Sequence, residues 1–399
     1  MQSDAEALAR RGALSPMMVC TAAGIALAVA MGIGRFAFTP MLPLMVRDGS
    51  LSLGDGAWIA ASNYLGYLVG ALVAARLRMP SPALMRASLA GIVVTTAAMG
   101  LFDGVPVWNV LRWAAGVFSA WAMIAVSAWA LPRLAAAARS ELSGFIYAGV
   151  GIGIAFAGLF CLVSARPGVA AAWLWLELGG FALLAAAVSA AFTFRPGAAR
   201  TQSGSQPVAA LPPGAGAGLV ISYGAFGFGY ILPATFLPAL AREIWDDPQV
   251  FGLAWPIFGT AAALSTIAVA RWSAGINRLR LWAICHAIMA SGVVLPSLWL
   301  SPAVIVVAAL AVGGTFVVVT MIGMQEARER SAGDPTKLLA AMTAAFAVGQ
   351  LAGPLVSGAI DLVGIGHRAA LGHALRIAAF ALAVSGIGLW RQSRRGMTT

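Results

Sequence analysis

The amino-acid sequence predicts an all-α integral membrane protein with twelve transmembrane helices in two pseudo-symmetric bundles of six. Three observations support this prediction. Of the 399 residues, 60% are hydrophobic and only 10% are charged, whereas soluble globular domains carry about 25% charged residues. Apolar runs of about 20 residues, the length that spans the hydrocarbon layer as a helix, recur along the whole chain. A weak repeat also relates the two halves of the sequence.

The apolar runs, read between polar or Pro/Gly breaks, give twelve expected spans. Arg10 and Arg11 precede the first run and Ala28-Val29-Ala30 lies within it, which imitates a cleaved signal peptide. The further runs downstream favour a first transmembrane helix instead. The expected spans are residues 17–46, 56–75, 83–101, 106–130, 141–163, 170–194, 216–241, 250–270, 281–299, 302–324, 338–361 and 371–390.

One polar, Pro/Gly-rich stretch at residues 195–214 divides the spans six and six. We therefore expect an N-terminal six-helix bundle over residues 1–194 and a cytoplasmic linker over 195–214. A C-terminal six-helix bundle is expected over 215–399.

Basic residues gather in alternate loops and at the termini, with eighteen on one side of the expected membrane and four on the other. Because positive loops stay cytoplasmic, both termini are expected in the cytoplasm and the chain in a bacterial inner membrane. The net charge of +11 is then explained without nucleic-acid binding. The eighteen are Arg10, Arg11, Arg76, Arg78, Arg86, Arg133, Arg139, Arg195, Arg200, Arg271, Arg278, Arg280, Arg328, Arg330, Lys337, Arg391, Arg394 and Arg395, and the four are Arg47, Arg166, Arg242 and Arg368.

Part of the first span is repeated, with substitutions, in the second half of the chain. GIGRFAFTPMLP (32–43) recurs 195 residues later as GFGYILPATFLP (227–238), with Tyr230 in the place of Arg35. Six plus six helices in parallel repeats is the arrangement of major facilitator transporters.

Three segments resemble motifs of the major facilitator superfamily. GVGIGIAFAG (149–158) and GQLAGPLVSG (349–358) are similar to the antiporter motif GxxxGPxxGG, although the first lacks the proline. Arg112 with Gly116 resembles the RxxxG motif, whose arginine is associated with proton coupling. The loop after the second span lacks the aspartate of the usual DRxGR signature. The motif residues to which the resemblance gives a packing or gating role are Gly149, Gly153, Gly158, Gly349, Gly353, Pro354 and Gly358.

The opening of the first span narrows the match. GIGRFAFTPMLPLM (32–45) resembles the YbfB/YjiJ-type major facilitator family of bacterial permeases. The superfamily resemblance covers the whole chain and implies a twelve-helix transporter.

Arg35 is the main candidate for substrate binding. An arginine at a helix centre costs about 2.5–3.5 kcal/mol on insertion scales, so its side chain is expected to face a cavity. The alternatives are snorkelling to the outer surface and a structural ion pair. Thr39, one turn further, is expected on the same face. The glycines expected to pack this helix closely and the prolines expected to bend it and free backbone carbonyls are Gly32, Gly34, Pro40 and Pro43.

Further polar side chains at membrane depth are candidates for lining the cavity, with helix packing as the alternative role for each. They are Asn63, Tyr67, Arg112, Tyr147, Tyr223, Tyr230 and Gln350. Arg112 and Glu177 are the candidates for proton coupling. A structural role is the alternative for Glu177, because the sixth helix is peripheral in the fold that the resemblance implies.

These features predict a secondary transporter that moves a small anionic or carboxylate-bearing solute by alternating access. Two buried arginines and few buried acids favour an anion, and the glycine-rich fifth and eleventh spans favour proton-linked export. Uptake of an organic anion is the alternative, and a polytopic membrane enzyme or sensor is disfavoured because three scattered histidines offer no catalytic cluster. The isolated cysteines Cys20, Cys161 and Cys285 show no metal-like spacing. No metal or cofactor is expected, the lipid bilayer surrounds the chain, and a monomer is expected.

Overall fold

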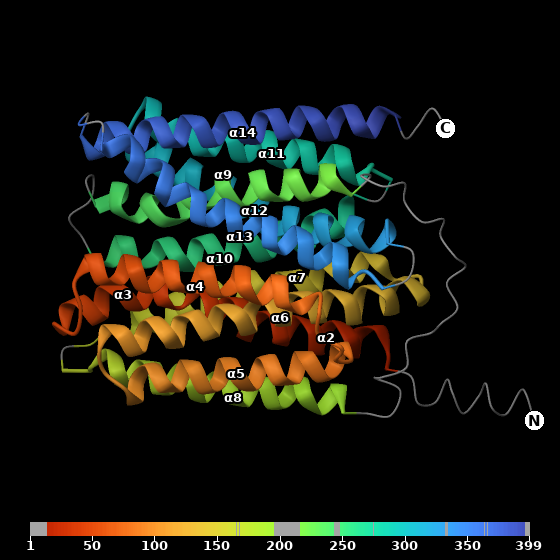
Figure 1. Ribbon diagram of the computed structural model, residues 1–399, viewed down its shortest axis with the longest axis horizontal. Helices are drawn as coiled ribbons and strands as arrows, with labels where there is room; N and C mark the ends of the chain where they lie inside the picture. Colours follow the sequence, from red (N-terminus) through yellow and green to blue (C-terminus); the bar gives the residue numbers. More distant parts are fainter. Residues whose placement is uncertain are drawn as a thin grey trace, which may run out of the picture.

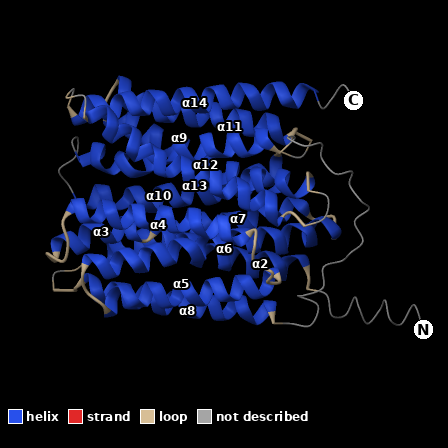
Figure 2. Cartoon of the chain, viewed as in Figure 1, coloured by secondary structure: helices blue, strands red, loops and turns tan. Residues whose placement is uncertain are grey.

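The structure is a computed structural model that describes residues 14–164, 166, 168–194, 216–242, 248–273, 275–331, 334–362, 364 and 366–395. Within these ranges the chain consists of helices and short connections, with no strand (Figure 2). The predicted linker at 195–214 lies outside the described residues.

Twelve segments of the described chain are long and apolar enough to cross a membrane, which confirms the predicted fold class. The first of them contains three successive helices, α2, η1 and α3. The helices are α2 Pro16–Leu27, η1 Ala28–Phe36, α3 Phe38–Arg47, α4 Leu53–Ala74, α5 Ser81–Leu101, α6 Val105–Ala136, η2 Ser140–Leu142, α7 Ser143–Ser164, α8 Ala171–Thr193, α9 Ala217–Arg242, α10 Pro248–Trp272, α11 Arg278–Leu298, α12 Pro302–Glu329, α13 Thr336–Asp361 and α14 His367–Arg395.

The expected span boundaries agree with these helices to within a few residues at most ends. The exceptions are the ends of α6, α12 and α14, which continue past residues 130, 324 and 390. Each extension carries charged side chains, such as Arg133 and Glu329. Hydropathy detects the part of a helix that lies in hydrocarbon, so it does not detect a polar extension of the same helix.

Local sequence signals account for several helix starts. The Ser52 side chain accepts a hydrogen bond from the backbone N–H of Asp55, and the Asp55 carboxylate accepts one from the backbone N–H of Ser52, which forms a capping box at α4. Ser15 and Ser301 cap α2 and α12 in a similar way, each followed by a proline in the first turn.

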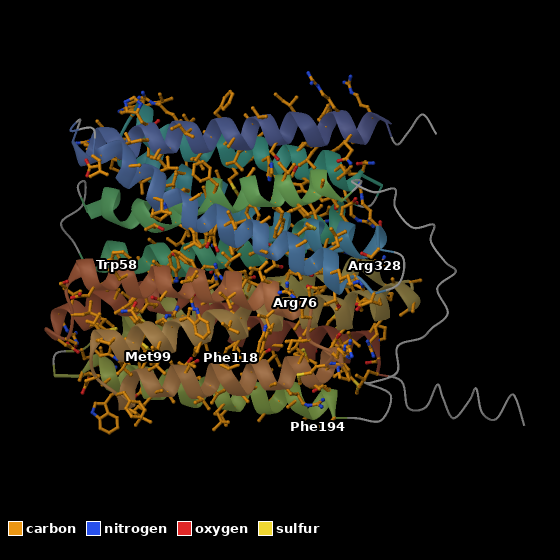
Figure 3. All side chains as sticks on the ribbon, in the orientation of Figure 1. Trp58, Arg76, Met99, Phe118, Phe194 and Arg328 are labelled. Carbon is orange, nitrogen blue, oxygen red and sulfur yellow. The ribbon has the colours of Figure 1, made fainter. Side chains whose placement is uncertain are left out.

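The helices form two groups of six spans that lie side by side (Figure 1). One group comprises α2 to α8 and the other α9 to α14. At the boundary between the groups, α7 packs against α10 and α4 packs against α13. Because the number of spans is even, α2 begins and α14 ends at the same end of the molecule, here called the terminal end. Arg76 and Arg328 lie toward this end (Figure 3).

The α7–α10 seam is closed by glycines spaced seven residues apart on α7. A Cβ atom added at Gly144 would lie 2.3 Å from the Cβ of Ala270, and one at Gly151 would lie 2.5 Å from the backbone of Ala263. At Gly158 an added Cβ would lie 2.7 Å from the ring of a proline on α10. Only glycine permits the two helices to approach this closely, so small residues set the distance between the two groups along this seam.

Equivalent contacts between the first and fifth spans of the two groups are separated by 200 residues in the sequence. The sequence repeat suggested a separation of 195 residues. A Cβ added at Gly24 would meet the carbonyl of Phe145 at 3.2 Å, and one added at Gly224 would meet the carbonyl of Ala345 at 3.3 Å. Gly24 and Phe145 thus lie 200 positions before Gly224 and Ala345, respectively. Tyr230 is therefore not the structural counterpart of Arg35, and the 195-residue repeat in this span does not follow the packing.

A candidate anion-binding site between the two halves

Residues 28–36 of the first span form a π-helix, which separates the α-helical segments α2 and α3. π-Helical turns are rare and frequently occur at functional sites. Arg35 is the last but one residue of this segment and is 3% exposed. The arginine therefore lies in the interior of the molecule, somewhat past the middle of the first span.

The Arg35 guanidinium joins the two halves of the molecule. Its Nη2 donates a hydrogen bond to Oε1 of Gln350 on α13. Its Cζ lies 3.8 Å from the centroid of the Tyr67 ring on α4, which is a cation–π contact. Both partners were predicted as site residues, and Gln350 belongs to the opposite half of the chain.

Several donors in this group have no protein partner. Nε and Nη1 of Arg35 are buried and have no hydrogen-bond partner among the described residues, and the same is true of Nε2 of Gln350. A guanidinium carries five N–H donors, so most of its hydrogen-bonding capacity is unused here. Buried polar groups are normally paired because leaving them unpaired costs about 1–3 kcal/mol each, more for charged groups. An acceptor close to these buried donors would therefore be strongly favoured.

The positive charge of Arg35 is also not balanced by an acid. Among the described residues no carboxylate lies within ion-pair distance of Arg35 or Arg112. Glu326 is the buried acid of the described chain, and it pairs with Arg330 at 2.8 Å at the terminal end of α12. The region around Arg35 is consequently positive and holds unpartnered hydrogen-bond donors, which suits an anion.

Arg112 has a different position from the one expected of a substrate ligand. Its Nη1 donates to the carbonyl of Gly34 and its Nη2 to the carbonyl of Arg35, each at 2.7 Å. These carbonyls lie near the junction of η1 and α3, where the helix type changes. Arg112 thus holds the backbone that carries Arg35, so it is a positioning residue in this structure.

Two prolines of the first span, Pro40 and Pro43, lie in α3, just after the backbone that Arg112 holds. Proline lacks a backbone N–H, so Pro40 and Pro43 leave the carbonyls four residues before them, those of Phe36 and Thr39, without an α-helical partner. The carbonyls that Arg112 reaches are those of the two residues that precede Phe36.

A very small cavity of about 10 Å³, enough for about one water molecule, adjoins the Arg35 group. Of the predicted residues, Tyr67 and Tyr223 line it. Tyr230 does not line it, but its ring stacks on Phe316 and Phe346 at centroid distances of 4.9 and 5.8 Å. The structure therefore brings Arg35, Tyr67, Gln350 and two tyrosines of α9 into one region between the halves.

The other predicted site residues lie outside this group. Asn63 donates from Nδ2 to the carbonyl of Arg112 at 2.9 Å and so joins α4 to α6. The hydroxyl of Tyr147 pairs with Ser127 at 2.8 Å inside the first half. Thr39 is half-buried on α3 and does not line the cavity. The alternative that was open for such residues, helix packing, describes Asn63 and Tyr147 well.

Glu177 is exposed on α8, at the outside of the first half. It does not line the cavity and is not among the residues around Arg35. This placement does not support the predicted coupling role, because a coupling carboxylate needs access to the transported ions. An exposed side chain seven residues into the helix could not be distinguished from a buried one by composition alone.

Sequence reasoning missed the apolar wall of the site. The cavity lining includes the rings of Phe36, Phe316 and Phe346, together with Thr320 of α12. Phe346 lies one helical turn before Gln350, so this neighbour could have been found by its spacing. Phe316 could not, since α12 is apolar on all sides and carries no periodic signal. The remaining lining residues are Met31, Met123, Val150 and Val317.

The glycines of the two antiporter-like motifs make unequal contacts. Gly149 and Gly153 of α7 approach the backbone of the first span, where added Cβ atoms would lie 2.1 and 2.4 Å from carbonyl oxygens. Gly349 makes the equivalent approach in the second half, at 2.3 Å from the carbonyl of Gly224. Gly358 has open space where a Cβ would lie, so no close packing requires glycine there.

The other glycines predicted to pack closely also differ in what surrounds them. An added Cβ at Gly32 would lie 2.3 Å from Gly153, whereas those at Gly34 and Gly353 would meet side chains of Ile92 and Ile231. Pro354 is accommodated within α13. Among the described residues there is no group of three or more His, Cys, Asp or Glu side chains placed to hold a metal ion.

Comparisons with known proteins agree with this architecture. A family model described as "Uncharacterised MFS-type transporter YbfB" matches residues 27–389. No curated protein sequence matches the chain. The crystal structure of the human organic anion transporter MFSD10 (TETRAN) is similar, with a TM-score of 0.71 and 14% sequence identity, over 94% of this chain and 100% of that one. At this identity the likeness shows the major facilitator fold alone.

The family match spans most of the chain, and the twelve membrane-spanning segments agree with it. The chain is a multi-pass membrane transporter rather than an enzyme, and it belongs to the YbfB-type family of the major facilitator superfamily.

Proposed function

We propose that the protein is a secondary transporter that carries a small, carboxylate-bearing anion across a bacterial inner membrane. The solute binds between the two halves at Arg35 and Gln350. Alternating access arises when the halves rock about this site, as in other transporters built from repeats.

The observation that carries the proposal is the set of unpartnered donors around Arg35. Nε and Nη1 of Arg35 and Nε2 of Gln350 are buried and lack acceptors among the described residues. A carboxylate offers two oxygens that match the planar fork of a guanidinium. It would pair the charge and connect α13 to the first span at the same time. The structurally similar human MFSD10 is described as an organic anion transporter, which is in keeping with this proposal.

The remaining details of the proposal rest on the sequence. The strong excess of basic residues in alternate loops supports cytoplasmic termini. Proton-linked export is favoured over uptake because α7 and α13 carry glycine motifs similar to those of antiporters. The protein works as a monomer and needs no cofactor.

The test is transport by the full chain in proteoliposomes, with radiolabelled lactate, succinate and benzoate as solutes. Replacing Arg35 by Ala should abolish carboxylate flux, and Arg35→Lys should reduce it strongly because an ammonium cannot form the bidentate fork. Arg86→Ala is the matched control, since Arg86 contacts Thr193 and the Phe194 ring at the periphery of the first half. A pH gradient imposed on the vesicles should alter the flux.

Unchanged carboxylate flux in Arg35→Ala, with normal insertion and folding, would contradict the proposed binding role. Flux that does not respond to the pH gradient would exclude proton coupling and leave facilitated diffusion or another coupling ion.

A further inference from the structure

The cavity beside Arg35 is walled by aromatic rings from both halves. Phe36 belongs to the first span, Tyr67 to α4, Phe316 to α12 and Phe346 to α13. The Arg35 Cζ lies 5.7 Å from the Phe36 ring, 3.8 Å from the Tyr67 ring and 6.0 Å from the Phe346 ring. The charged group and the rings therefore belong to one site.

The aromatic rings contact one another in a continuous array, either stacked or edge to face. Phe316 and Tyr230 stack with an interplanar angle of 10°, and Tyr230 and Phe346 stack with one of 18°. Phe36 meets Phe316 edge to face, with centroids 5.9 Å apart. Offset stacking and edge-to-face contact are the two arrangements that aromatic groups prefer. A further flat ring placed among these side chains would find faces and edges already oriented for both kinds of contact.

The unpartnered donors of Arg35 and Gln350 lie next to the aromatic wall. The rest of the lining consists of methionine and valine side chains together with Thr320 and Tyr223. The Thr320 hydroxyl donates to the carbonyl of Phe316 at 3.0 Å within its own helix, so its proton is already engaged. This arrangement fits a solute with one anionic group and one flat apolar body.

We propose that the transported solute is an aromatic monocarboxylate, a compound in which a single carboxylate is attached to a flat ring. The inference rests on the proposed function, because it assumes that Arg35 and Gln350 bind the carboxylate. The ring of the solute lies against Phe316 and Phe346 and its carboxylate accepts hydrogen bonds from Arg35. The cavity has room for only about one water molecule in this conformation, so the lining side chains must separate before the solute enters.

The experiment compares binding of benzoate and cyclohexanecarboxylate to the purified full chain by isothermal titration calorimetry. The two anions are similar in size and charge at pH 7 and differ in aromaticity. Aromatic contacts beyond burial should make benzoate bind about two- to tenfold more tightly. Indole-3-carboxylate should share this preference, whereas neutral benzamide should bind weakly or not at all.

Single-residue variants test which side chains cause the preference for benzoate over cyclohexanecarboxylate. Phe346→Leu should bring the two affinities close together while cyclohexanecarboxylate still binds. Phe118→Leu is the matched control. Phe118 lies within the first half (Figure 3). It packs against Trp121 with ring centroids 5.6 Å apart and does not line the cavity. This variant should keep the full benzoate preference.

The outcomes separate the two proposals. Equal binding of benzoate and cyclohexanecarboxylate to the unmodified protein, lost for both in Arg35→Gln, would overturn the aromatic inference and leave the anion-binding function standing. Failure of both acids to bind would count against the proposed function itself. The comparison on the unmodified chain needs no variant, so it stands even where Phe346→Leu does not fold.

Discussion

Replacing Gly151 by alanine tests whether the glycine seam sets the distance between the two halves. The added Cβ would lie 2.5 Å from the backbone N of Ala263 and 2.5 Å from the carbonyl oxygen of Gly259. Ordinary contact begins at about 3.4 Å, so α7 and α10 would have to separate by about 0.9 Å. Both obstacles are backbone atoms, which cannot rotate aside as a side chain can.

The expected cost follows from two opposing effects. Overpacking of this kind destabilises by about 1–3 kcal/mol. Alanine stabilises a helix relative to glycine by up to about 1 kcal/mol, which offsets part of that cost. We expect Gly151→Ala to be destabilised by about 1–2 kcal/mol relative to the unmodified protein. Gly358→Ala is the matched control, since it adds the same methyl group to α13, where the Cβ finds open space.

The measurement is thermal unfolding of both variants in the same detergent, followed by intrinsic tryptophan fluorescence. Gly151→Ala should lower the midpoint by a few degrees, and Gly358→Ala should leave it unchanged or raise it slightly. Transport by Gly151→Ala should also slow, because the misfit lies between the halves that move. A midpoint for Gly151→Ala at or above that of Gly358→Ala would refute the reasoning.

Two further predictions concern contacts that hold the site and the halves. Arg112→Gln should lower both the carboxylate affinity and the thermal stability, because two hydrogen bonds from a charged donor are worth about 1.5–3 kcal/mol each. Isothermal titration calorimetry measures the affinity and thermal unfolding measures the stability. Unmodified-protein values for both would contradict the prediction. The Gln325 Nε2 donates to the Ser143 hydroxyl at 2.7 Å across the halves near the terminal end. Gln325→Leu should therefore favour separation of the two halves at the terminal end. A cysteine placed at Thr266 should then react faster with a maleimide reagent. An unchanged labelling rate would contradict this prediction.

The twelve spans could be predicted closely because the hydrocarbon layer imposes a length and a composition on every segment. Where the prediction failed, as at the end of α6, the helix continues beyond the apolar run that the rule detects. Arg35 was predicted as a site residue for a similar reason, since a charge at membrane depth is costly wherever it lies, and the structure places it in the interior. Both predictions use a constraint that acts on each segment separately.

The rest of the site depends on contacts between segments. Arg112 and Arg35 are both arginines within apolar spans, and their sequences give no sign that Arg112 binds the backbone beside Arg35. The motif comparison treated Gly158 and Gly358 alike, yet only Gly158 faces a neighbouring helix at close range. The π-helix at residues 28–36 also has no marker in its composition. Such differences arise from packing, which a single sequence does not record.

The uncompensated charge of Arg35 has an electrical consequence. A site without an acidic partner carries one more positive charge when it is empty than when a monoanion occupies it. Moving one elementary charge across the full membrane changes the energy by about 2.3 kcal/mol per 100 mV. A site that traverses only part of the field during alternation experiences the corresponding fraction. The membrane potential should therefore act differently on the empty and the loaded carrier, so voltage can influence which step of the cycle is slow.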